Sequence, residues 1–187
     1  MLSWRVTYME RTVPPEDAAP PAPDGVTFMH DGDVGPDTYR VLLRDVGEDW
    51  LWWERLACND ADLSAALSDP TSVIYILRAD GNVAGFAELN LYDAKAPAIR
   101  YFGLTPEFIG RGLGGYMMSA LLHLAWQPHV RRVTLDTCDL DHPGAIPFYR
   151  RYGFAETHSE VLTAEDPRQA GILPLTAAPH IPLNRQL

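Results

Sequence analysis

The segment PEFIGRGLGG, residues 106–115, places four glycines and one arginine in ten positions, directly before an apolar run. Glycines at the start of a helix leave backbone N–H groups uncovered by side chains, and the helix dipole adds partial positive charge there. Such a start can bind a phosphate or pyrophosphate, and Arg111 adds a cation. A loop that only needs positive φ and close packing is the structural alternative. The spacing of these glycines favours a phosphate-binding turn.

Gly110, Gly112 and Gly115 also fit the G-x-G-x-x-G pattern of a dinucleotide-binding turn. That turn follows a strand directly, whereas TPEFI separates these glycines from a strand that ends near Leu104. A doubly wound fold would also need several further strand–helix units after the glycines. An NAD(P)-dependent oxidoreductase is therefore a remote alternative. A P-loop is excluded because no Lys-Ser/Thr pair follows the glycines.

The composition indicates one globular domain over residues 1–187, with 47% hydrophobic and 21% charged residues. A formal net charge of −10 argues against non-specific nucleic-acid binding. Two distant cysteines, Cys58 and Cys138, indicate neither a disulfide framework nor a zinc site. The start of the chain does not resemble a signal peptide, and the longest apolar run is too short to cross a bilayer. We expect a cytoplasmic protein without membrane contact.

Hydrophobic periodicity predicts a mixed α/β (α+β) architecture in the order β-αα-βββ-α-β-α-β. A Pro-rich connector, residues 13–25, follows the first strand, and a Pro-rich tail, residues 163–187, has at most one short strand. The Asp-Gly dipeptide at 80–81 predicts a hairpin between two β-branched runs. The first five expected strands cover residues 4–12, 72–79, 83–91, 96–104 and 131–138, and the sixth follows the last helix. The expected helices cover residues 35–47, 61–69, 114–126 and 142–154.

Two stretches together resemble the coenzyme A-binding core of the GNAT superfamily of N-acetyltransferases. They are FGLTPEFIGRGLGGYMMSALL, from Phe102, and DHPGAIPFYRRYGF, which ends at Phe154. The family signature has Arg/Gln-x-x-Gly-x-Gly/Ala at a helix start, and a later short helix that ends in Tyr-x-x-x-Gly-Phe. The glycines of the signature map to Gly112 and Gly114, and its tyrosine maps to Tyr149. The resemblance implies a mostly antiparallel sheet of six to seven strands with about four helices.

The resemblance also implies acetyl-CoA as co-substrate and no metal. This sequence departs from the signature at two positions. Ile109 stands where Arg or Gln is commonest, so backbone amides should carry most of the pyrophosphate binding. His142 stands where Asn usually begins the later helix, and it either replaces the Asn contact or only caps the helix. The implied cofactor-binding residues are Phe102, Gly103, Leu104, Ile109, Gly110, Arg111, Gly112, Leu113, Gly114, Gly115, His142 and Tyr149.

The implied reaction is direct attack of a primary amine on the acetyl thioester. A backbone N–H near Phe102 to Leu104, where we expect a strand bulge, would face the thioester oxygen. Tyr149 matches the family's general acid, with a core tyrosine as the structural alternative. Glu88 is the candidate base and acceptor-binding residue, because apolar residues flank it on its strand. The alternative for Glu88 is an outward-facing glutamate.

Three tryptophans, Trp50, Trp52 and Trp53, follow the first helix, and we expect one of them to line the acceptor pocket. Trp50 and Trp53 are the candidates for that contact. His123 is expected to be a core histidine with a hydrogen-bond partner. The acidic stretch HDGDVGPD, from His30, lacks the spacing of a calcium loop, so no metal site is expected.

The sequence thus predicts an acetyl-CoA-dependent N-acetyltransferase that acts on an amine of a small molecule or peptide. A module that binds acyl-CoA without turnover is the second hypothesis, and it would need neither Tyr149 nor a base. The acceptor itself has no readable code in the sequence. Exposed strand edges and the tail are compatible with a homodimer.

Overall fold

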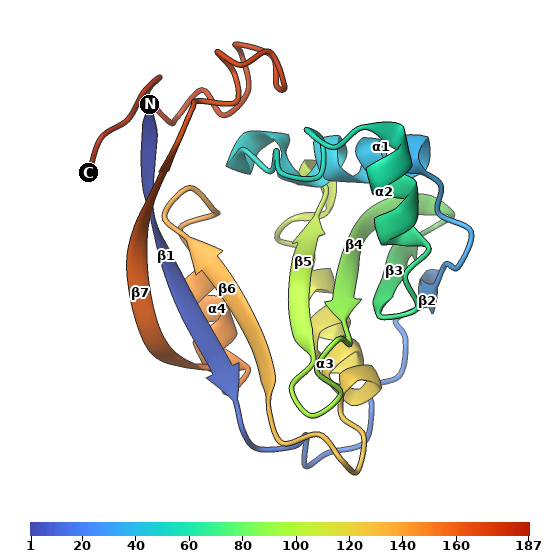
Figure 1. The fold of residues 1–187 in the computed structure, drawn as a ribbon. Helices are drawn as coiled ribbons and strands as arrows, with labels where there is room; N and C mark the ends of the chain where they lie inside the picture. The colour runs from blue at the N-terminus through green and yellow to red at the C-terminus, as the bar shows by residue number, and fades with distance from the viewer.

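The computed structural model describes residues 1–187 as one seven-stranded sheet with four α-helices (Figure 1). The expected mixed architecture is therefore confirmed. Two short 3-10 turns, η1 (Glu48–Trp50) and η2 (Pro106–Phe108), directly precede chain segments that line the cleft described below. The elements are β1 (Leu2–Arg11), β2 (Val26–His30), α1 (Pro36–Gly47), α2 (Asp60–Leu67), β3 (Ser72–Ala79), β4 (Asn82–Asn90), β5 (Ala98–Leu104), α3 (Leu113–Ala125), β6 (Val133–Cys138), α4 (Ala145–Arg151) and β7 (Ala155–Ala164).

The sheet has the strand order β2-β3-β4-β5-β6-β1-β7, and only the β5–β6 pair is parallel. The N-terminal strand β1 therefore lies inside the sheet, between two strands from the C-terminal third of the chain. It pairs antiparallel with β6 from Val6 to Arg11 and with β7 from Leu2 to Glu10. Figure 1 shows β1 and β7 side by side, far from β2.

The parallel strands β5 and β6 separate soon after they meet. Only Ala98 and Ile99 of β5 pair with β6, so the rest of β5 has no partner on that edge. In Figure 1 the two strands diverge toward the end of the molecule that carries α1. This divergence divides the sheet into a half formed by β2 to β5 and a half formed by β6, β1 and β7.

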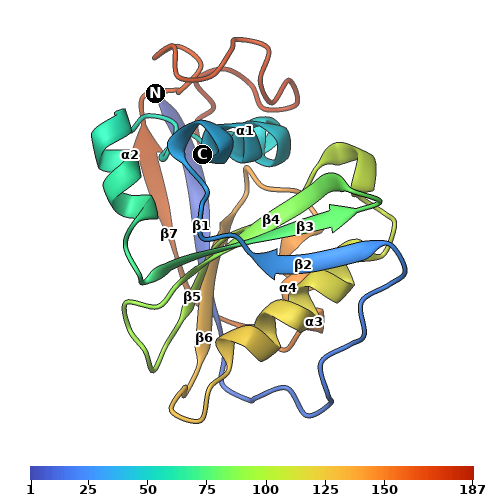
Figure 2. The same ribbon diagram turned by 90° about the vertical axis from the view of Figure 1, so that its right-hand side faces the viewer.

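The helices cover opposite faces of the sheet (Figure 2). α1 and α2 bury Tyr39, Leu43 and Leu63 against Ile76 and Phe86 of β3 and β4. α3 buries its apolar side on the other face, against strands of both halves, and side chains of α4 pack onto the same cluster. The core is therefore continuous across both halves on the α3 face. The members of this cluster include Met9, Leu89, Ile99, Met118, Leu121 and Leu135.

Local signals in the sequence place several boundaries correctly. Asn59 caps α2, because its side chain accepts a hydrogen bond from the backbone N–H of Asp62. Pro36 begins α1, where a missing N–H is tolerated. The β3–β4 hairpin turns at Asp80 and Gly81, with φ of 49° and 80°, as expected for an Asp-Gly turn. His123 lies between the carbonyls of Ser119 and Asp17, at 2.7 Å from each, so it does have partners.

One strand was missed by the sequence analysis. β2 (Val26–His30) pairs antiparallel with β3 at the edge of the sheet. It is short, and only Val26 is buried, so its pattern of apolar residues is weak. The alternation of Val26 and Phe28 after Gly25 was the available signal.

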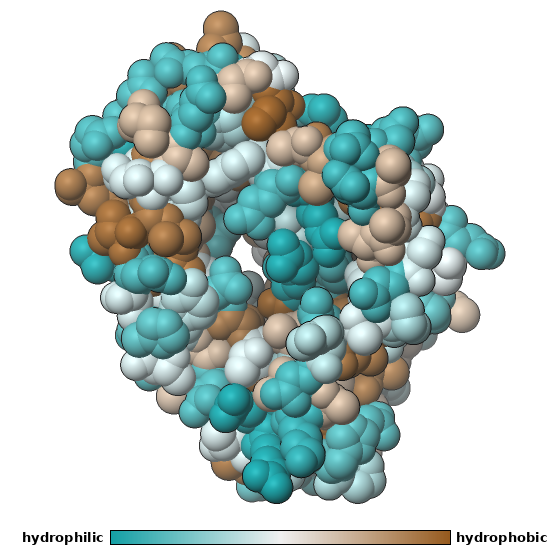
Figure 3. Space-filling view, in the orientation of Figure 1, coloured by the Kyte–Doolittle hydropathy of each residue, from teal (hydrophilic) through white to brown (hydrophobic).

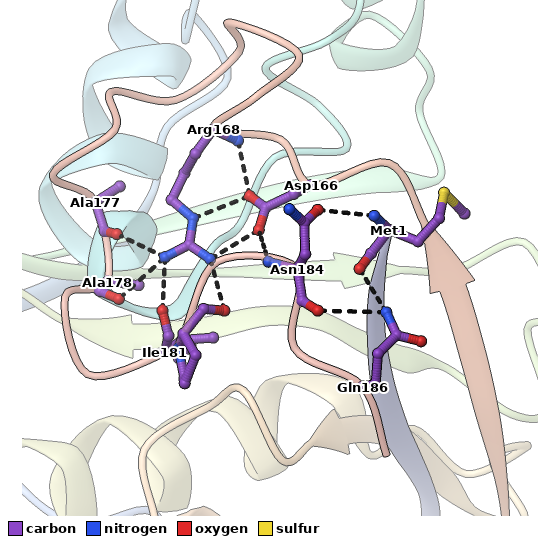
Figure 4. A network of polar contacts seen from close by, with 9 residues as sticks. Met1, Asp166, Arg168, Ala177, Ala178, Ile181, Asn184 and Gln186 are labelled. Atoms are coloured by element: carbon purple, nitrogen blue, oxygen red, sulfur yellow. Dashed lines mark hydrogen bonds and ion pairs between the residues drawn. The ribbon is translucent and has the colours of Figure 1, made fainter.

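The tail after β7 contains no strand, and it is held by a buried ion pair (Figure 4). Arg168 binds both carboxylate oxygens of Asp166, at 2.9 and 2.8 Å, and both side chains are almost fully buried. The remaining guanidinium hydrogens reach backbone carbonyls of the tail. These carbonyls belong to Ala177, Ala178, Ile181 and Pro182.

The tail also binds the start of β1. The N-terminal ammonium of Met1 donates to Asn184 at 2.7 Å, and the side-chain amide of Gln186 donates to the Met1 carbonyl at 2.7 Å (Figure 4). Apolar tail residues such as Leu173 and Ile181 pack with Leu2 and Trp4. The Pro-rich composition thus produces an ordered cover over one end of β1. None of the helices has the length and apolar character needed to cross a membrane.

Candidate active site

A cleft of about 900 Å³ lies at the divergence of β5 and β6. Both strands contribute to its walls, together with the glycine segment, α4, β1 and the tryptophan segment after α1. Figure 3 shows the surface hollowed between the two halves of the sheet, with hydrophilic residues on its border. Of the expected cofactor-binding residues, ten line this cleft: Phe102, Gly103, Leu104, Ile109, Gly110, Gly112, Gly114, Gly115, His142 and Tyr149.

The glycine segment begins helix α3, as expected. Gly112 is the N-cap residue, and no side chain caps the helix. The backbone N–H groups of Leu113 and Gly114 have no backbone acceptor in the chain. Gly110 and Gly112 have φ of 82° and 80°, and a Cβ added to either would meet nothing within 4 Å. These conformations keep bare amides open toward the cleft.

Two expected members of the cofactor site lie elsewhere. The Leu113 side chain is buried beneath the helix, and only its backbone N–H remains available. The Arg111 guanidinium lies over the ring of Phe108, 4.9 Å from its centroid, and does not line the cleft. Both residues flank the glycines, so they still shape the segment.

The bulge in β5 lies earlier than expected. Residues 101–104 pair regularly with β4, and Arg100 is the extra residue, because Glu88 pairs with Tyr101 and Leu89 with Ile99. The N–H of Thr105 donates to the Ala84 carbonyl of β4. Successive N–H groups of a strand point alternately to its two edges. The N–H groups of Phe102 and Leu104 therefore point away from β4, toward the gap before β6. The expectation of a bulge at residues 102–104 is therefore wrong. Backbone N–H groups without a partner are nevertheless present in this part of β5, because the strand has no neighbour on its other edge.

Tyr149 reaches the cleft from helix α4. Its ring packs against Phe102 of β5 and Phe154, at centroid distances of 6.4 and 6.1 Å. Burial raises the pKa of its phenol well above the ordinary value, and Asp141 and Asp136 raise it further. The hydroxyl is therefore neutral at ordinary pH, as a proton donor must be.

All three tryptophans after α1 line the cleft, whereas the sequence analysis expected only one of them to line a pocket. Trp52 fits between Gly47 and Gly103, since a Cβ on either glycine would come within 2.5 and 3.2 Å of its indole. Trp50 lies against His142 and His180, each at a centroid distance of 5.3 Å. Trp53 packs edge-on against Trp4 of β1.

His142 forms part of the cleft wall and also binds the backbone of the turn before α4. Its Nδ1 accepts a hydrogen bond from the Gly144 N–H at 2.9 Å, immediately before α4. Helix α4 itself has no side-chain cap, so this contact orders the turn before the helix.

Glu88 does not lie in the cleft. It is completely buried on β4, where it accepts hydrogen bonds from Tyr39, from Ser72 at 3.1 Å and from Arg55 at 3.1 Å. These contacts tie α1 and the segment after it to the sheet. The outward-facing alternative is wrong as well, because the side chain has no exposure.

Other carboxylates, which the sequence analysis did not single out, line the cleft in its place. Asp136 of β6 and Glu54 are both accessible from the cleft. Partial burial raises the pKa of Asp136, and the nearby Glu54 and Asp141 raise it further. Asp136 lies directly opposite Tyr8 of β1, which also lines the cleft. The alternation of apolar and polar residues in VTLDTC was a signal that Asp136 faces away from the α3 core.

The sheet opens between its two parallel strands, with an uncapped glycine-rich helix start at the opening, and this architecture is that of solved acetyltransferase structures. The acetyltransferase (GNAT) family matches residues 37–154, so the chain belongs to this family.

Individual relatives agree with this assignment. A mycothiol acetyltransferase of Clavibacter sepedonicus is 30% identical over 109 residues, which is 57% of this chain and 35% of that protein. The crystal structure of a GCN5-related N-acetyltransferase from Sphaerobacter thermophilus has a TM-score of 0.62 and 21% identity, covering 86% of this chain and 51% of the other. A GNAT acetyltransferase from Elizabethkingia anophelis, crystallised with acetyl-CoA bound, has a TM-score of 0.55 and 18% identity, covering 73% and 80%.

The structural likenesses, all under 25% identical, concern the fold alone. The chain spans about a third of the curated relative and about half of the Sphaerobacter protein.

Proposed function

We propose that the protein is an N-acetyltransferase that transfers an acetyl group from acetyl-CoA to a primary amine. The observation that carries this proposal is the cleft itself. Free amides of the α3 start and of β5 line one continuous cavity with Tyr149. Family membership supports acetyl transfer in general.

The residues at the glycine segment fit the cofactor. The open space above Gly110 and Gly112 admits a pyrophosphate that a side chain would otherwise exclude. The unpaired amides of Leu113 and Gly114 supply donors without a competing cap. The edge amides of Phe102 and Leu104 would bind the amide groups of the pantetheine arm, as an added strand does at a sheet edge. Acetyl-CoA supplies the activated acyl group as a thioester.

The chain's own residues would then serve three needs of the reaction. The amine nitrogen forms a bond to the thioester carbon while the carbon–sulfur bond breaks. An edge N–H of β5 stabilises the charge that develops on the carbonyl oxygen. Tyr149 donates its phenolic proton to the departing sulfur.

The proton of the attacking ammonium needs an acceptor inside the cleft. Asp136 suits this role, because it is accessible there and its pKa is raised toward the range of a useful base. Glu88 has no access to the cleft. We therefore assign Glu88 a positioning role, through its contacts with Tyr39 and Arg55.

A binding module without turnover remains the alternative function. It would retain the glycine segment, but it would not need Tyr149 or Asp136 on the cleft wall. An oxidoreductase is disfavoured by the divergent sheet and by the family match.

Two measurements test the proposal. Acetyl-CoA and NADH are added separately to the protein, and the shift of the melting temperature is recorded, because a ligand that binds only the folded form raises it. We expect a rise with acetyl-CoA alone. Release of thiol from acetyl-CoA is then followed with a panel of primary amines. Stabilisation without thiol release from any amine would favour the binding module.

A further inference from the structure

The cleft has a second wall, on the face opposite α3 and α4, and its residues differ in charge from those around the glycines. On β6, β1 and β7 this face carries alternate residues in register. Asp136 lies opposite Tyr8, and Tyr8 lies opposite His158. Glu160 lies one alternate position farther along β7, opposite Val6. All of these side chains project on the same side of the sheet.

Tyr8 links the two outer strands of this wall. Its hydroxyl donates to Glu160 at 2.6 Å, and its ring stacks on His158 at a centroid distance of 4.3 Å. The bond to Glu160 and partial burial raise the pKa of Tyr8 to about 12, so the phenol stays neutral. Glu160 is thereby fixed beside a residue of the cleft, although it is itself exposed at the rim.

The charges on this wall are unbalanced. Glu54 is offset by Arg100, at 3.6 Å. Neither Asp136 nor Glu160 takes part in any ion pair. The other arginine on the cleft, Arg151, comes from α4 on the opposite face. The charge of Arg100 also lowers the pKa of Asp136, so this one arginine offsets Glu54 and Asp136 only in part, and the three carboxylates Glu54, Asp136 and Glu160 leave the wall with an excess of negative charge.

Their separation suits a particular kind of molecule. Strands β6 and β7 flank β1 and are therefore about 10 Å apart, and Tyr8 of β1 lies opposite Asp136 and donates a hydrogen bond to Glu160. Trp53 and Leu162 supply apolar surface next to this pair. An aliphatic chain with a cation at each end matches an apolar strip between two carboxylates.

We infer that the acceptor is a dication or polycation, whose reactive amine lies near Asp136 while a second cationic group pairs with Glu160. This inference rests on the proposed function and extends it to the class of acceptor. It predicts that the protein distinguishes acceptors by the charge of the group at the far end from the reacting amine.

Three probes of equal length test the inference, since they share a primary amine and differ only at the far end. They are 1,6-diaminohexane, 6-amino-1-hexanol and 6-aminohexanoic acid, with a cationic, neutral and anionic terminus. We expect kcat/KM for the diamine to exceed that for the amino alcohol by about tenfold or more, and the amino acid to be the poorest substrate. The preference should shrink as salt is raised, because the rim carboxylate is exposed.

Glu160→Gln is the informative variant, and Glu156→Gln is its matched control. Both remove one carboxylate from β7, but Glu156 lies opposite Met9, on the other face, and pairs with Arg150 of α4. The Glu160→Gln variant should reduce the ratio of diamine to amino alcohol to within about threefold of unity, while Glu156→Gln keeps the wild-type ratio. An amino alcohol used as well as the diamine by the wild type, or a ratio unaffected by Glu160→Gln, would overturn the inference.

Calorimetric titration of the same probes in the presence of coenzyme A separates this inference from the proposed function. Preferential binding of the diamine, lost in Glu160→Gln, without any thiol release would support the cationic site and reject the transferase. Thiol release with equal use of the diamine and the amino alcohol would support the transferase and reject the cationic site.

Discussion

The indole Nε1–H of Trp52 donates a hydrogen bond to Oδ1 of Asp141 at 3.1 Å, and this bond joins the two halves of the divergent sheet. Trp52 belongs to the segment after α1 and packs on Phe86 and Tyr101 of β4 and β5. Asp141 follows β6, and its second oxygen accepts from Thr137 and from the Cys138 N–H. The bond therefore fixes the separation of the cleft walls where the strands have ceased to pair.

Substitution of Asp141 by Ala should destabilise the protein by about 1–3 kcal/mol, because three donors lose their acceptor together. Asp141→Asn keeps one acceptor oxygen and should cost less. Urea unfolding followed by tryptophan fluorescence measures both. Identical midpoints for the wild type and Asp141→Ala would show that the bond does not hold the walls together.

Substitution of Tyr149 by Phe should lower turnover by about a hundredfold or more, since the departing sulfur loses its proton donor. Acetyl-CoA affinity should stay nearly unchanged, because the ring contacts with Phe102 and Phe154 remain. Thiol release and calorimetric titration measure the two quantities. Tyr75→Phe, on β3, removes a phenol away from the cleft and serves as the control. Full turnover in Tyr149→Phe would remove the acid role.

Gly112→Ala should weaken acetyl-CoA binding by about tenfold or more, because a methyl group would stand at the entrance to the free amides of α3. Gly81→Ala is a matched control. Both glycines have φ of 80° and open space around an added Cβ, but Gly81 lies in the β3–β4 hairpin. Each variant should lose about 1–2 kcal/mol of stability from the backbone conformation alone. Equal acetyl-CoA affinity in the two variants would contradict the proposed pyrophosphate-binding site at Gly112.

Glu88→Gln separates a positioning role from a catalytic one. The variant should lower the free energy of unfolding, since the guanidinium of Arg55 is largely buried and would lose its ionic partner. Turnover per folded molecule should fall by less than about tenfold. A hundredfold loss of turnover at unchanged stability would restore Glu88 as the base. Ser72→Ala removes one donor to the same carboxylate and should give a smaller effect in the same direction.

The buried Asp166–Arg168 pair predicts a specific acid sensitivity. Hydrogen bonds from Arg168 lower the pKa of Asp166 from 3.8 to about 2. Because the folded pKa is the lower one, this carboxylate stabilises the fold above about pH 4, and the contribution is lost as pH falls from 4 to 2.

Urea midpoints measured across that window should fall more steeply for the wild type than for Asp166→Asn, whose side chain does not titrate. Arg168→Met leaves Asp166 buried without its cation and should cost about 3–5 kcal/mol near neutral pH. Parallel pH profiles for the wild type and Asp166→Asn would contradict the role of the pair.

The features that the sequence predicted correctly depend on short stretches of chain. The glycines before α3 and the Asp80-Gly81 turn each act through their own neighbours, so a local pattern suffices. Family resemblance supplied the order of elements and the position of Tyr149 in the cleft.

The features that were missed arise from contacts between distant segments. Glu88 was expected in the acceptor pocket because the sequence does not show that Tyr39 and Arg55 enclose it. The position of β1 between β6 and β7 depends on pairing across more than a hundred residues, for which no local pattern exists. The same pairing places Tyr8 beside Asp136, and for that reason the sequence analysis did not identify this wall of the cleft.

The position of β1 between β6 and β7 has a consequence for biosynthesis. β1 is synthesised before β6 and β7 and has no pairing partner until both have been made, whereas the intervening segment already forms its own hairpin and helices. β1 therefore stays unpaired while the later strands are synthesised. Closing the long loop between β1 and β6 slows the last step of folding. We expect the domain to complete its folding only after translation of β7, so nascent chains that stop before Ala155 should remain sensitive to protease at their N-terminal end.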